Sequence, residues 1–284
     1  MYMNKSPLVT VILSVYQESL SHLDTALQSI VAQTHFDFEC IIIIDDPENT
    51  SAIEYVKNLS LKDTRFRYLV HKKSRGLAVC RNEAIQQATG RYVALMDADD
   101  IMKENRLARQ LDYCELHEVD GVFSHAMYID EDGKEMNAFT PEPVESLPHD
   151  IFKRHMFVHP TGFFKTELLQ ANPYDESLQR SQDLELWLRL VRLGYKLAIV
   201  PEILLMYRLY PNASLEKRIK RQRGYSKYGL QVALGQFKFF WRYIVYYRFL
   251  VSRLLYWCVT HLPSWLLKPT LQLKTWSADQ KNTS

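Results

Sequence analysis

The sequence predicts an α/β protein with a doubly wound, mostly parallel sheet, followed by a basic helical tail. Apolar runs at Leu8–Val15, Phe38–Ile44 and Tyr92–Met96 are short and continuous, which is typical of strands buried on both faces. Segments with helical periodicity separate these strands, and such alternation favours parallel pairing. With 284 residues and a hydrophobic content of 47%, the chain is long enough for one large domain and an appendage, and global disorder is excluded.

The elements predicted along residues 8–210 follow one another in a regular order. After the first strand, a helix is predicted at His22–Ala32 with Ser21 as its N-cap. The next elements are a helix at Ala52–Leu59, a strand at Arg65–Val70, and a helix at Leu77–Ala88 that a glycine turn at Gly90 ends. Further along the chain we predict a helix at Asn105–His117 and a strand at Gly121–Ile129. Two helices follow, at Thr166–Asn172 and Gln182–Leu193, and then short strands on either side of Pro201, at Lys196–Val200 and Leu204–Arg208. Residues 137–160 contain four prolines and no periodicity, so a long loop is predicted there.

The cysteines and the first apolar segment bear on the compartment. Cys40, Cys80, Cys114 and Cys258 are widely spaced and form no Cys-x-x-Cys or Cys/His pattern. They are predicted to be buried, reduced thiols of a cytosolic protein. No small-x-small cleavage site follows the first apolar run, which is therefore interpreted as a strand and not as a signal peptide.

The strand at Tyr92–Met96 leads directly into three carboxylates within four residues, Asp97, Asp99 and Asp100. Ligands of open α/β sheets bind at the carboxyl ends of strands. Adjacent carboxylates repel one another unless a cation or hydrogen-bond donors compensate. Hard oxygen ligands suit Mg²⁺ or Mn²⁺ bound together with substrate phosphates. The alternative is that Asp99 or Asp100 caps a helix that starts near Lys103, but one cap accounts for one aspartate only.

Several ordered blocks across residues 7–210 resemble family 2 glycosyltransferases of the bacterial polysaccharide or lipopolysaccharide type, which have the GT-A fold. The blocks are Val11–Gln17, Ser29–Thr34 with Phe38-Glu39, Asp45-Asp46, Gly76–Ala78 with Arg81–Ala84, Ala88–Tyr92, the Asp-x-Asp motif Asp97-Ala98-Asp99, and Gln182-Asp183 with Leu186 and Arg189. Two positions depart from the family pattern: Gln17 replaces an Asn, and Pro47-Glu48-Asn49 replaces the Gly-Ser that usually follows the acidic pair.

The resemblance implies a donor site, a metal site and a catalytic base. The residues implied to bind the nucleotide sugar are Val15, Tyr16, Asp45, Asp46, Gly76, Arg81, Asp97, Ala98, Asp99 and His159. Asp99 and Asp100 are implied to hold Mn²⁺ or Mg²⁺, and Asp183 to act as the base that takes the acceptor's hydroxyl proton. Each assignment has a structural alternative: turn formation for the acidic pair, a surface position for the arginine, a helix-dipole role for Asp183 and a packing role for the histidine.

The reaction implied by the resemblance is metal-dependent, inverting transfer of a hexosyl or N-acetylhexosaminyl group. The donor is a nucleotide-diphosphate sugar, expected to be a UDP-sugar, and the acceptor is a glycan or a polyprenyl- or lipid-linked glycan. A sugar nucleotidyltransferase is the alternative enzyme, although the turn after the first strand, Val15–Glu18, lacks the Gly-rich basic loop of that chemistry. A dinucleotide oxidoreductase is disfavoured because G-x-G-x-x-G is absent. The non-enzyme alternative is a membrane-docked subunit that binds nucleotide sugars without turnover.

The charge of the chain divides it into two parts. Residues 1–216 contain 22 basic and 32 acidic residues, whereas residues 217–274 contain 12 basic residues and no acidic one. We therefore expect a GT-A domain at 1–210 and a basic amphipathic tail at 211–284.

The tail is aromatic as well as basic. Arginines interrupt its apolar run, so no stretch reaches the roughly 18–20 apolar residues of a spanning helix. Lys238, Arg242, Arg248 and Arg253 fall on one helical arc, which is typical of a helix at a membrane interface. The alternatives are docking on the acidic body or in a homo-oligomer interface, and no nucleic-acid-binding motif accompanies the charge. The expected location is peripheral, on the cytoplasmic face of the cell membrane.

Overall fold

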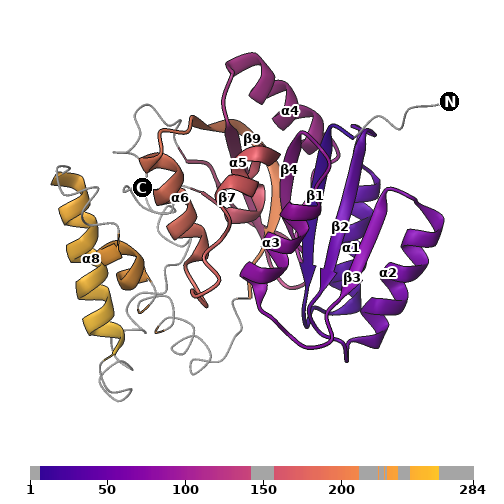
Figure 1. Ribbon diagram of the computed structural model, residues 1–284, viewed down its shortest axis with the longest axis horizontal. Helices are drawn as coiled ribbons and strands as arrows, with labels where there is room; N and C mark the ends of the chain where they lie inside the picture. The colour runs from indigo at the N-terminus through magenta and orange to yellow at the C-terminus, as the bar shows by residue number, and fades with distance from the viewer. Residues whose placement is uncertain are drawn as a thin grey trace, which may run out of the picture. The chain divides into compact units, whose positions relative to one another are not determined.

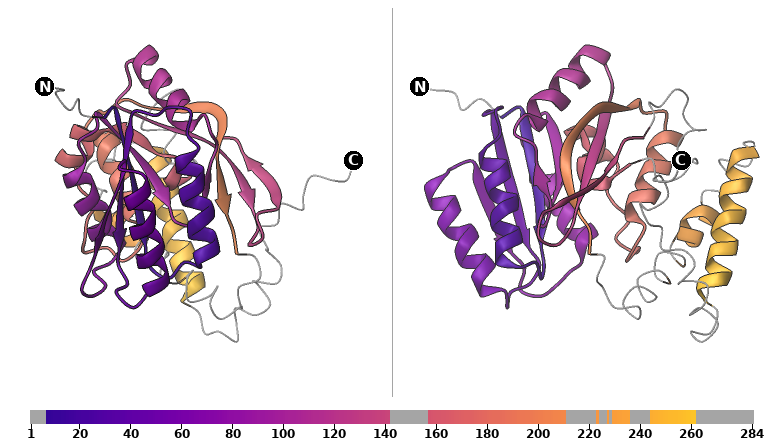
Figure 2. Two further views of the ribbon diagram at one scale, coloured as in Figure 1. Left: turned by 90° about the vertical axis from the view of Figure 1, so that its right-hand side faces the viewer. Right: turned by 180° about the vertical axis from the view of Figure 1, so that it is seen from behind.

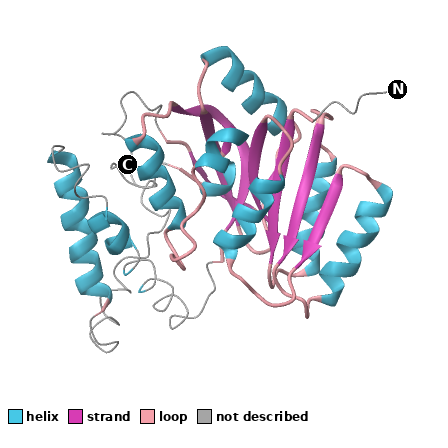
Figure 3. Cartoon of the chain, in the orientation of Figure 1, coloured by secondary structure: helices cyan, strands magenta, loops and turns pink. Residues whose placement is uncertain are grey.

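The computed structural model describes residues 7–141, 157–210, 223, 227, 229–235 and 244–261. The chain divides into two compact units, Met1–Leu209 and Tyr210–Ser284. The first unit contains one large sheet with helices on both faces (Figure 1), built from strands that alternate with helices (Figure 3). Within the described part of the second unit, the longest element is helix α8 (Ile244–Thr260).

Four parallel strands form the first half of the sheet, in the order β3-β2-β1-β4. The strands are β1 (Val9–Val15), β2 (Phe38–Ile44), β3 (Phe66–Val70) and β4 (Tyr92–Asp97). The connecting helices are α1 (Leu20–Val31), α2 (Thr50–Lys62) and α3 (Leu77–Gln87). α1 and α2 lie on one face of the sheet and α3 lies on the other (Figure 2), which confirms the doubly wound arrangement.

The register of the parallel strands places several polar residues at one edge. β1 and β2 are almost entirely buried because Val, Ile and Leu side chains of both faces pack into the core. Ser14 of β1 pairs with Asp97 of β4. Beyond the end of β2, the Asp45 N–H donates to the carbonyl of Val15 at 2.7 Å. The acidic residues after β2 and at the end of β4 therefore lie at the same level.

The second half of the sheet is mixed and continues in the order β4-β8-β6-β9-β5, with β7 paired to β6. Its strands are β5 (Ile101–Met102), β6 (Gly121–Ile129), β7 (Glu135–Phe139), β8 (Phe163–Lys165) and β9 (Leu197–Arg208). The remaining helices of this unit are α4 (Arg106–His117), the 3₁₀ turn η2 (His159–Thr161), α5 (Thr166–Ala171) and α6 (Gln182–Arg192). β8 is antiparallel to both of its neighbours, whereas β6 and β9 are parallel.

The strand predictions in this second half were partly wrong. β9 runs without interruption through Pro201, where two short strands were expected. Pro201 lies in a register shift, because Ser124 pairs with Val200 and the next residue, His125, pairs with Ile203. The proline therefore does not have to donate a hydrogen bond to β6. β7 occupies the start of the predicted loop 137–160, of which residues 142–156 lie outside the described residues. β5 and β8 were not predicted because two or three residues carry no periodic signal.

Two local predictions about helix ends were also wrong. The N-cap of α1 is Ser19, whose side chain accepts the His22 N–H, and not Ser21. α3 ends at Gln87, three residues before Gly90, and that glycine has no positive φ. A Cβ at Gly90 would lie 2.6 Å from the Thr10 nitrogen, so the glycine permits close approach to β1.

The tail and the cysteines were predicted with mixed success. Among the described residues, no helix has the length and apolar content needed to cross a membrane. Arg248 and Arg253 belong to α8, whereas Lys238 and Arg242 of the predicted basic arc lie outside the described residues. Three of the free thiols are buried as predicted, but Cys258 of α8 is exposed, so its predicted burial was wrong.

Candidate active site

The carboxyl ends of the parallel strands surround a cavity of about 320 Å³. It is lined by Ser14, Val15, Tyr16, Glu18, Asp45, Ser74, Gly76, Leu77 and Cys80. Four of the ten predicted donor-site residues, Val15, Tyr16, Asp45 and Gly76, therefore share one cavity. Val15, the last residue of β1, is buried, whereas Tyr16 is 45% exposed.

Asp45 is the centre of a hydrogen-bond network on this cavity. Its Oδ1 accepts from the Arg75 N–H at 2.8 Å and faces His71 Nδ1 at 2.6 Å. Its Oδ2 accepts from Ser74 Oγ and from the Gly76 N–H, both at 2.8 Å. Burial opposes ionisation of this carboxyl, but these donors outweigh it and hold its pKa below the usual range. A carboxylate offers about four acceptor positions, and all four are used within the protein.

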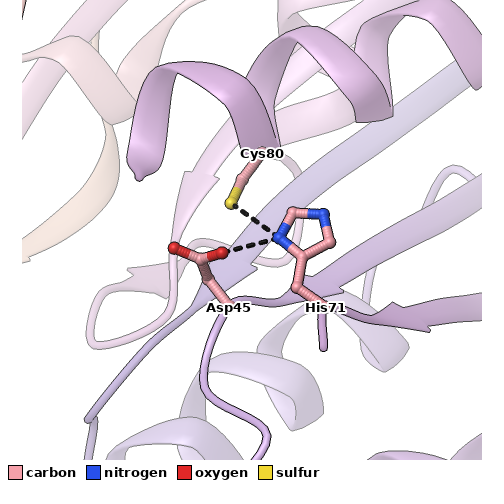
Figure 4. Close-up of side chains that lie close together, drawn as sticks. All are labelled: Asp45, His71 and Cys80. Atoms are coloured by element: carbon pink, nitrogen blue, oxygen red, sulfur yellow. Dashed lines mark hydrogen bonds and ion pairs between the residues drawn. The ribbon is translucent and has the colours of Figure 1, made fainter. Parts of the chain in front are cut away.

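His71 connects this carboxylate to helix α3. Its Nδ1 faces Asp45, and its Nε2 lies 2.7 Å from Oε2 of Glu83. The ring therefore bridges the carboxylates of Asp45 and Glu83. Cys80 Sγ lies 3.9 Å from the same Nδ1 (Figure 4), and burial raises the pKa of this thiol to about 12.

Among the described residues, these three side chains form a cluster that could hold a metal ion. The ligand atoms of Asp45, His71 and Cys80 lie within 4.8 Å of one another. Because the histidine nitrogen donates to the aspartate and the thiol stays protonated, hydrogen bonds already satisfy this cluster. Its sulfur and nitrogen donors also do not match the hard oxygen set that Mg²⁺ or Mn²⁺ prefers.

Gly76 and Asp46 lie on either side of this network. Gly76 has φ of 92°, a conformation that favours glycine, and it is the N-cap residue of α3, while its N–H donates to Asp45. The Asp46 side chain accepts a local hydrogen bond, from the Glu48 N–H at 3.0 Å, and the residue is partly buried. The two members of the acidic pair thus have different surroundings: one is held by the loop at 74–76 and the other remains near solvent.

The acidic turn after β4 has one buried and two partly exposed carboxylates. Asp97 and Asp99 are partly exposed, Ala98 is buried between them, and Asp100 is only 1% exposed. Oδ1 of Asp100 accepts the Arg208 N–H at 2.8 Å, and its Oδ2 is buried with no hydrogen-bond partner in the described part of the chain. Burial, followed by the charges of Asp97 and Asp99, raises the pKa of Asp100 well above its usual range. Helix α4 begins only at Arg106, so neither Asp99 nor Asp100 caps it.

Arg81 connects the acidic turn to the predicted catalytic base. This guanidinium is 8% exposed and donates from Nη2 to Asp97 Oδ1 at 2.9 Å. Burial lowers its pKa, but the charge and the hydrogen bond of Asp97, with a contribution from the charge of Asp183, outweigh burial and raise it. Asp183 stands in the first turn of α6, presented by Ser181 in a left-handed conformation with φ of 60°. Arg81 therefore pairs with the carboxylate at the end of β4, and the charge at the start of α6 contributes to its raised pKa.

His159 packs among aromatic rings beside this arginine. Its Nε2 lies 3.3 Å from the Tyr174 hydroxyl, and its ring centroid is 5.2 Å from that of Trp187. Nδ1 is shielded from solvent and has no hydrogen-bond partner among the described residues. Burial, and secondarily the charge of Arg81, hold the pKa of His159 well below its usual range, so the ring is neutral.

Sequence reasoning missed three residues of this site. Glu18 lines the cavity, and burial together with the charges of Asp99 and Asp97 raises its pKa. His71 follows β3 as Asp45 follows β2, so the strand-end rule was sufficient to find it. Arg208 ends β9 and contacts the acidic turn, and no local signal in the sequence indicates that contact.

Comparison with solved structures identifies the fold. The chain is similar to S. aureus TarS in complex with UDP, with a TM-score of 0.65 at 16% identity, covering 94% of this chain and 75% of that one. The complex of TarS with UDP-GlcNAc gives the same TM-score at 17% identity. With a doubly wound sheet and an acidic turn at the end of β4, the fold is that of a GT-A glycosyltransferase.

Sequence comparison identifies the family. A model of glycosyl transferase family 2 matches residues 10–169. The uncharacterized glycosyltransferase MJ1057 of Methanocaldococcus jannaschii is 35% identical over 272 residues, which are 94% of each chain. The amylovoran biosynthesis glycosyltransferase AmsE of Erwinia amylovora is 28% identical and covers 81% of this chain and 85% of its own. The chain belongs to glycosyl transferase family 2, as its sequence blocks predicted.

Proposed function

We propose that this protein is a metal-dependent, inverting glycosyltransferase. It transfers a hexosyl or N-acetylhexosaminyl group from a UDP-sugar to a glycan or lipid-linked acceptor during synthesis of a cell-surface polysaccharide. The observation that carries the proposal is the position of Arg81, which donates to Asp97 of the donor motif and whose pKa is also raised by the charge of Asp183. The bound UDP and UDP-GlcNAc of TarS and the role of AmsE in amylovoran biosynthesis support the donor and pathway class.

The proposed roles follow from the surroundings of each side chain. Asp183 accepts the proton of the acceptor hydroxyl as that oxygen attacks the anomeric carbon. Arg81 is hydrogen-bonded to Asp97 and neutralises part of the negative charge between donor and base. The turn Val15–Tyr16 and the loop that Asp45 holds shape the nucleoside end of the cavity, with Asp46 beside it.

The acidic turn suits a hard divalent cation. Oδ2 of Asp100 is buried and has no partner within residues 7–141 and 157–210 or the described part of the tail, and an unsatisfied carboxylate oxygen is costly unless a ligand or proton occupies its free face. Asp99 and Asp100 would hold Mn²⁺ or Mg²⁺ with the donor phosphates, in keeping with sites of one or two carboxylates. When bound, the ion stabilises the charge of the departing nucleoside diphosphate.

The tail supplies a second proposal, which concerns location. The tail is basic, and α8 exposes the apolar residues Val251, Leu254, Leu255 and Trp257. Both features support peripheral attachment to an anionic membrane, on the cytoplasmic face where lipid-linked acceptors are reached. Docking of the tail in a homo-oligomer interface is the competing arrangement. Pelleting with anionic and with neutral vesicles, and a measurement of mass in solution, separate the two.

The central test compares Asp183→Asn with Glu185→Gln. Glu185 stands on the same helical turn but pairs with Arg189 at 2.8 Å, so it controls for loss of a carboxylate at the start of α6. Transfer and hydrolysis of UDP-sugars are measured with and without Mn²⁺, using membrane-extracted glycolipids as acceptors. We expect Asp183→Asn to lower kcat at least 10²-fold with UDP binding retained, and Glu185→Gln to stay near wild type.

Different outcomes overturn different parts of the proposal. If Asp183→Asn transfers sugar at a near-normal rate while Asp99→Ala is inactive, then Asp183 is not the catalytic base, and the rest of the proposal stands. Binding of UDP-sugars without any hydrolysis or transfer in the presence of Mn²⁺ would indicate a non-catalytic binding subunit. Full activity in the presence of a chelator would disprove the metal dependence.

A further inference from the structure

Arg208, the last residue of β9, is buried although its guanidinium pairs with no carboxylate among the described residues. It is 5% exposed. Its Nε donates to the carbonyl of Asp99 at 2.8 Å, and its Nη1 donates to the carbonyls of Asp130 and Glu131 at 2.9 and 2.8 Å. A buried arginine without a carboxylate is unusual, because burial of a charge is costly unless its donors are well satisfied. The three carbonyls provide that satisfaction.

The same residue holds the acidic turn through its backbone. The Arg208 N–H donates to Oδ1 of Asp100 at 2.8 Å, whereas Oδ2 of that carboxylate has no partner among the residues that the structure describes. Immediately after the turn, β5 pairs with β9, with Ile101 opposite Met206. The acidic turn is thus held at two successive residues by one arginine, and β5 carries the contact into the sheet.

The other end of the guanidinium rests on a well-defined turn between β6 and β7. Oδ1 of Asp130 accepts the N–H groups of Asp132 and Lys134 at 3.0 and 2.9 Å. Gly133 has φ of 85°, so its conformation requires glycine. The carbonyls at 130 and 131 are therefore fixed in place, and Arg208 transmits that fixed position to the acidic turn.

We infer that Arg208 is a positioning residue, which holds Asp99 and Asp100 in the orientation that binds the metal and the donor diphosphate. The inference rests on the proposed function. Its physical basis is preorganisation: adjacent carboxylates repel one another, and the fork of donors prevents the turn from relaxing outward before the cation arrives. Loss of such an outer partner typically lowers metal affinity 10- to 100-fold.

The test uses Arg208→Met and Arg208→Lys, with Arg109→Met as the matched control. Every substitution keeps the backbone N–H to Asp100, so the variants isolate the guanidinium. Arg109 of α4 also contacts β9, through Glu202, but touches no residue of the acidic turn. Two measurements are made on the full chain: Mn²⁺ affinity in the presence of UDP, from the electron paramagnetic resonance of free Mn²⁺, and hydrogen exchange of the peptide at 97–102.

We expect Arg208→Met to weaken Mn²⁺ binding at least tenfold and to speed exchange at 97–102, with exchange in α2 unchanged. Arg208→Lys should recover part of both effects, and Arg109→Met should show neither. Unchanged Mn²⁺ affinity and exchange in Arg208→Met would overturn the inference, as would equal acceleration of exchange in α2, which indicates a general structural role. If the wild type itself binds no Mn²⁺ with UDP, the metal dependence in the proposed function fails, and exchange at 97–102 still decides whether Arg208 positions the turn.

Discussion

Asp45→Asn tests whether this carboxylate is the structural centre of the cavity. The amide keeps one acceptor oxygen and places an NH₂ group against two donors, either Ser74 Oγ with the Gly76 N–H or His71 with the Arg75 N–H. Two charge-assisted hydrogen bonds are lost, at about 1.5–3 kcal/mol each. The expected cost is about 3–6 kcal/mol, a large part of the 5–15 kcal/mol that typically stabilises a folded protein.

The adjacent Asp46→Asn is the matched control, because among the described residues the Asp46 side chain accepts one hydrogen bond, from the nearby Glu48 N–H. It should change stability by less than about 1 kcal/mol. Thermal unfolding followed by near-ultraviolet circular dichroism gives the comparison. At about 2–4 °C per kcal/mol for a domain of this size, Asp45→Asn should lower Tm by roughly 6–24 °C.

The two variants should also differ in ligand binding. Asp45→Asn should release the loop at 74–76, which fast hydrogen exchange of its amides would reveal. Asp46→Asn should leave the loop protected even where it weakens UDP binding. A Tm for Asp45→Asn within 3 °C of the control would refute the reasoning, since the four internal hydrogen bonds would then contribute little.

Three further predictions concern a buried ring, a close backbone contact and a surface thiol. The pKa of His159 is held well below its usual range, so the unfolded chain takes up a proton below about pH 6.5 that the native ring does not, and stability is lost as pH falls. His159→Gln should therefore remove up to about 2 kcal/mol of the loss between pH 7 and pH 5, measured by urea unfolding, and an unchanged pH dependence would contradict this. Gly90→Ala should destabilise the protein by about 2–4 kcal/mol, because its Cβ would lie 2.6 Å from backbone. Gly194→Ala, at φ of 84° in open space, should cost only about 1 kcal/mol. Equal Tm values for the two variants would be inconsistent with the close contact. Ellman's reagent should react rapidly with one thiol of the native protein, and Cys258→Ser should abolish that reaction, because burial raises the pKa of the three other thiols.

Much of the site was predictable because parallel strands carry two independent signals. β1, β2 and β4 are continuous apolar runs, and their carboxyl ends must meet at one edge of the sheet. From that rule alone, Asp45 and Asp97 were expected on the same edge, and the register confirms that both lie beside the end of β1. The family resemblance then predicted the GT-A fold, which the comparisons confirm.

What each of these residues does was decided by contacts between distant segments. The sequence indicates that Asp45 follows a strand, but not that the loop at 74–76 and His71 occupy all its acceptor positions. A local rule also failed at Pro201, where pairing with β6 continues across a residue that ordinarily ends a strand.

The sequence by itself therefore determined which strands are buried and which carboxylates stand at their ends, because burial and strand polarity are local properties of the chain. Only the tertiary structure decided which neighbours those carboxylates have. Arg208 lies 108 residues from Asp100 along the chain. The charge of Asp183, on another helix, contributes to the raised pKa of Arg81. Such contacts depend on how the sheet pairs and where its strands stop, and no pattern along the chain encodes them. The charged groups of this site are oriented by those long-range contacts.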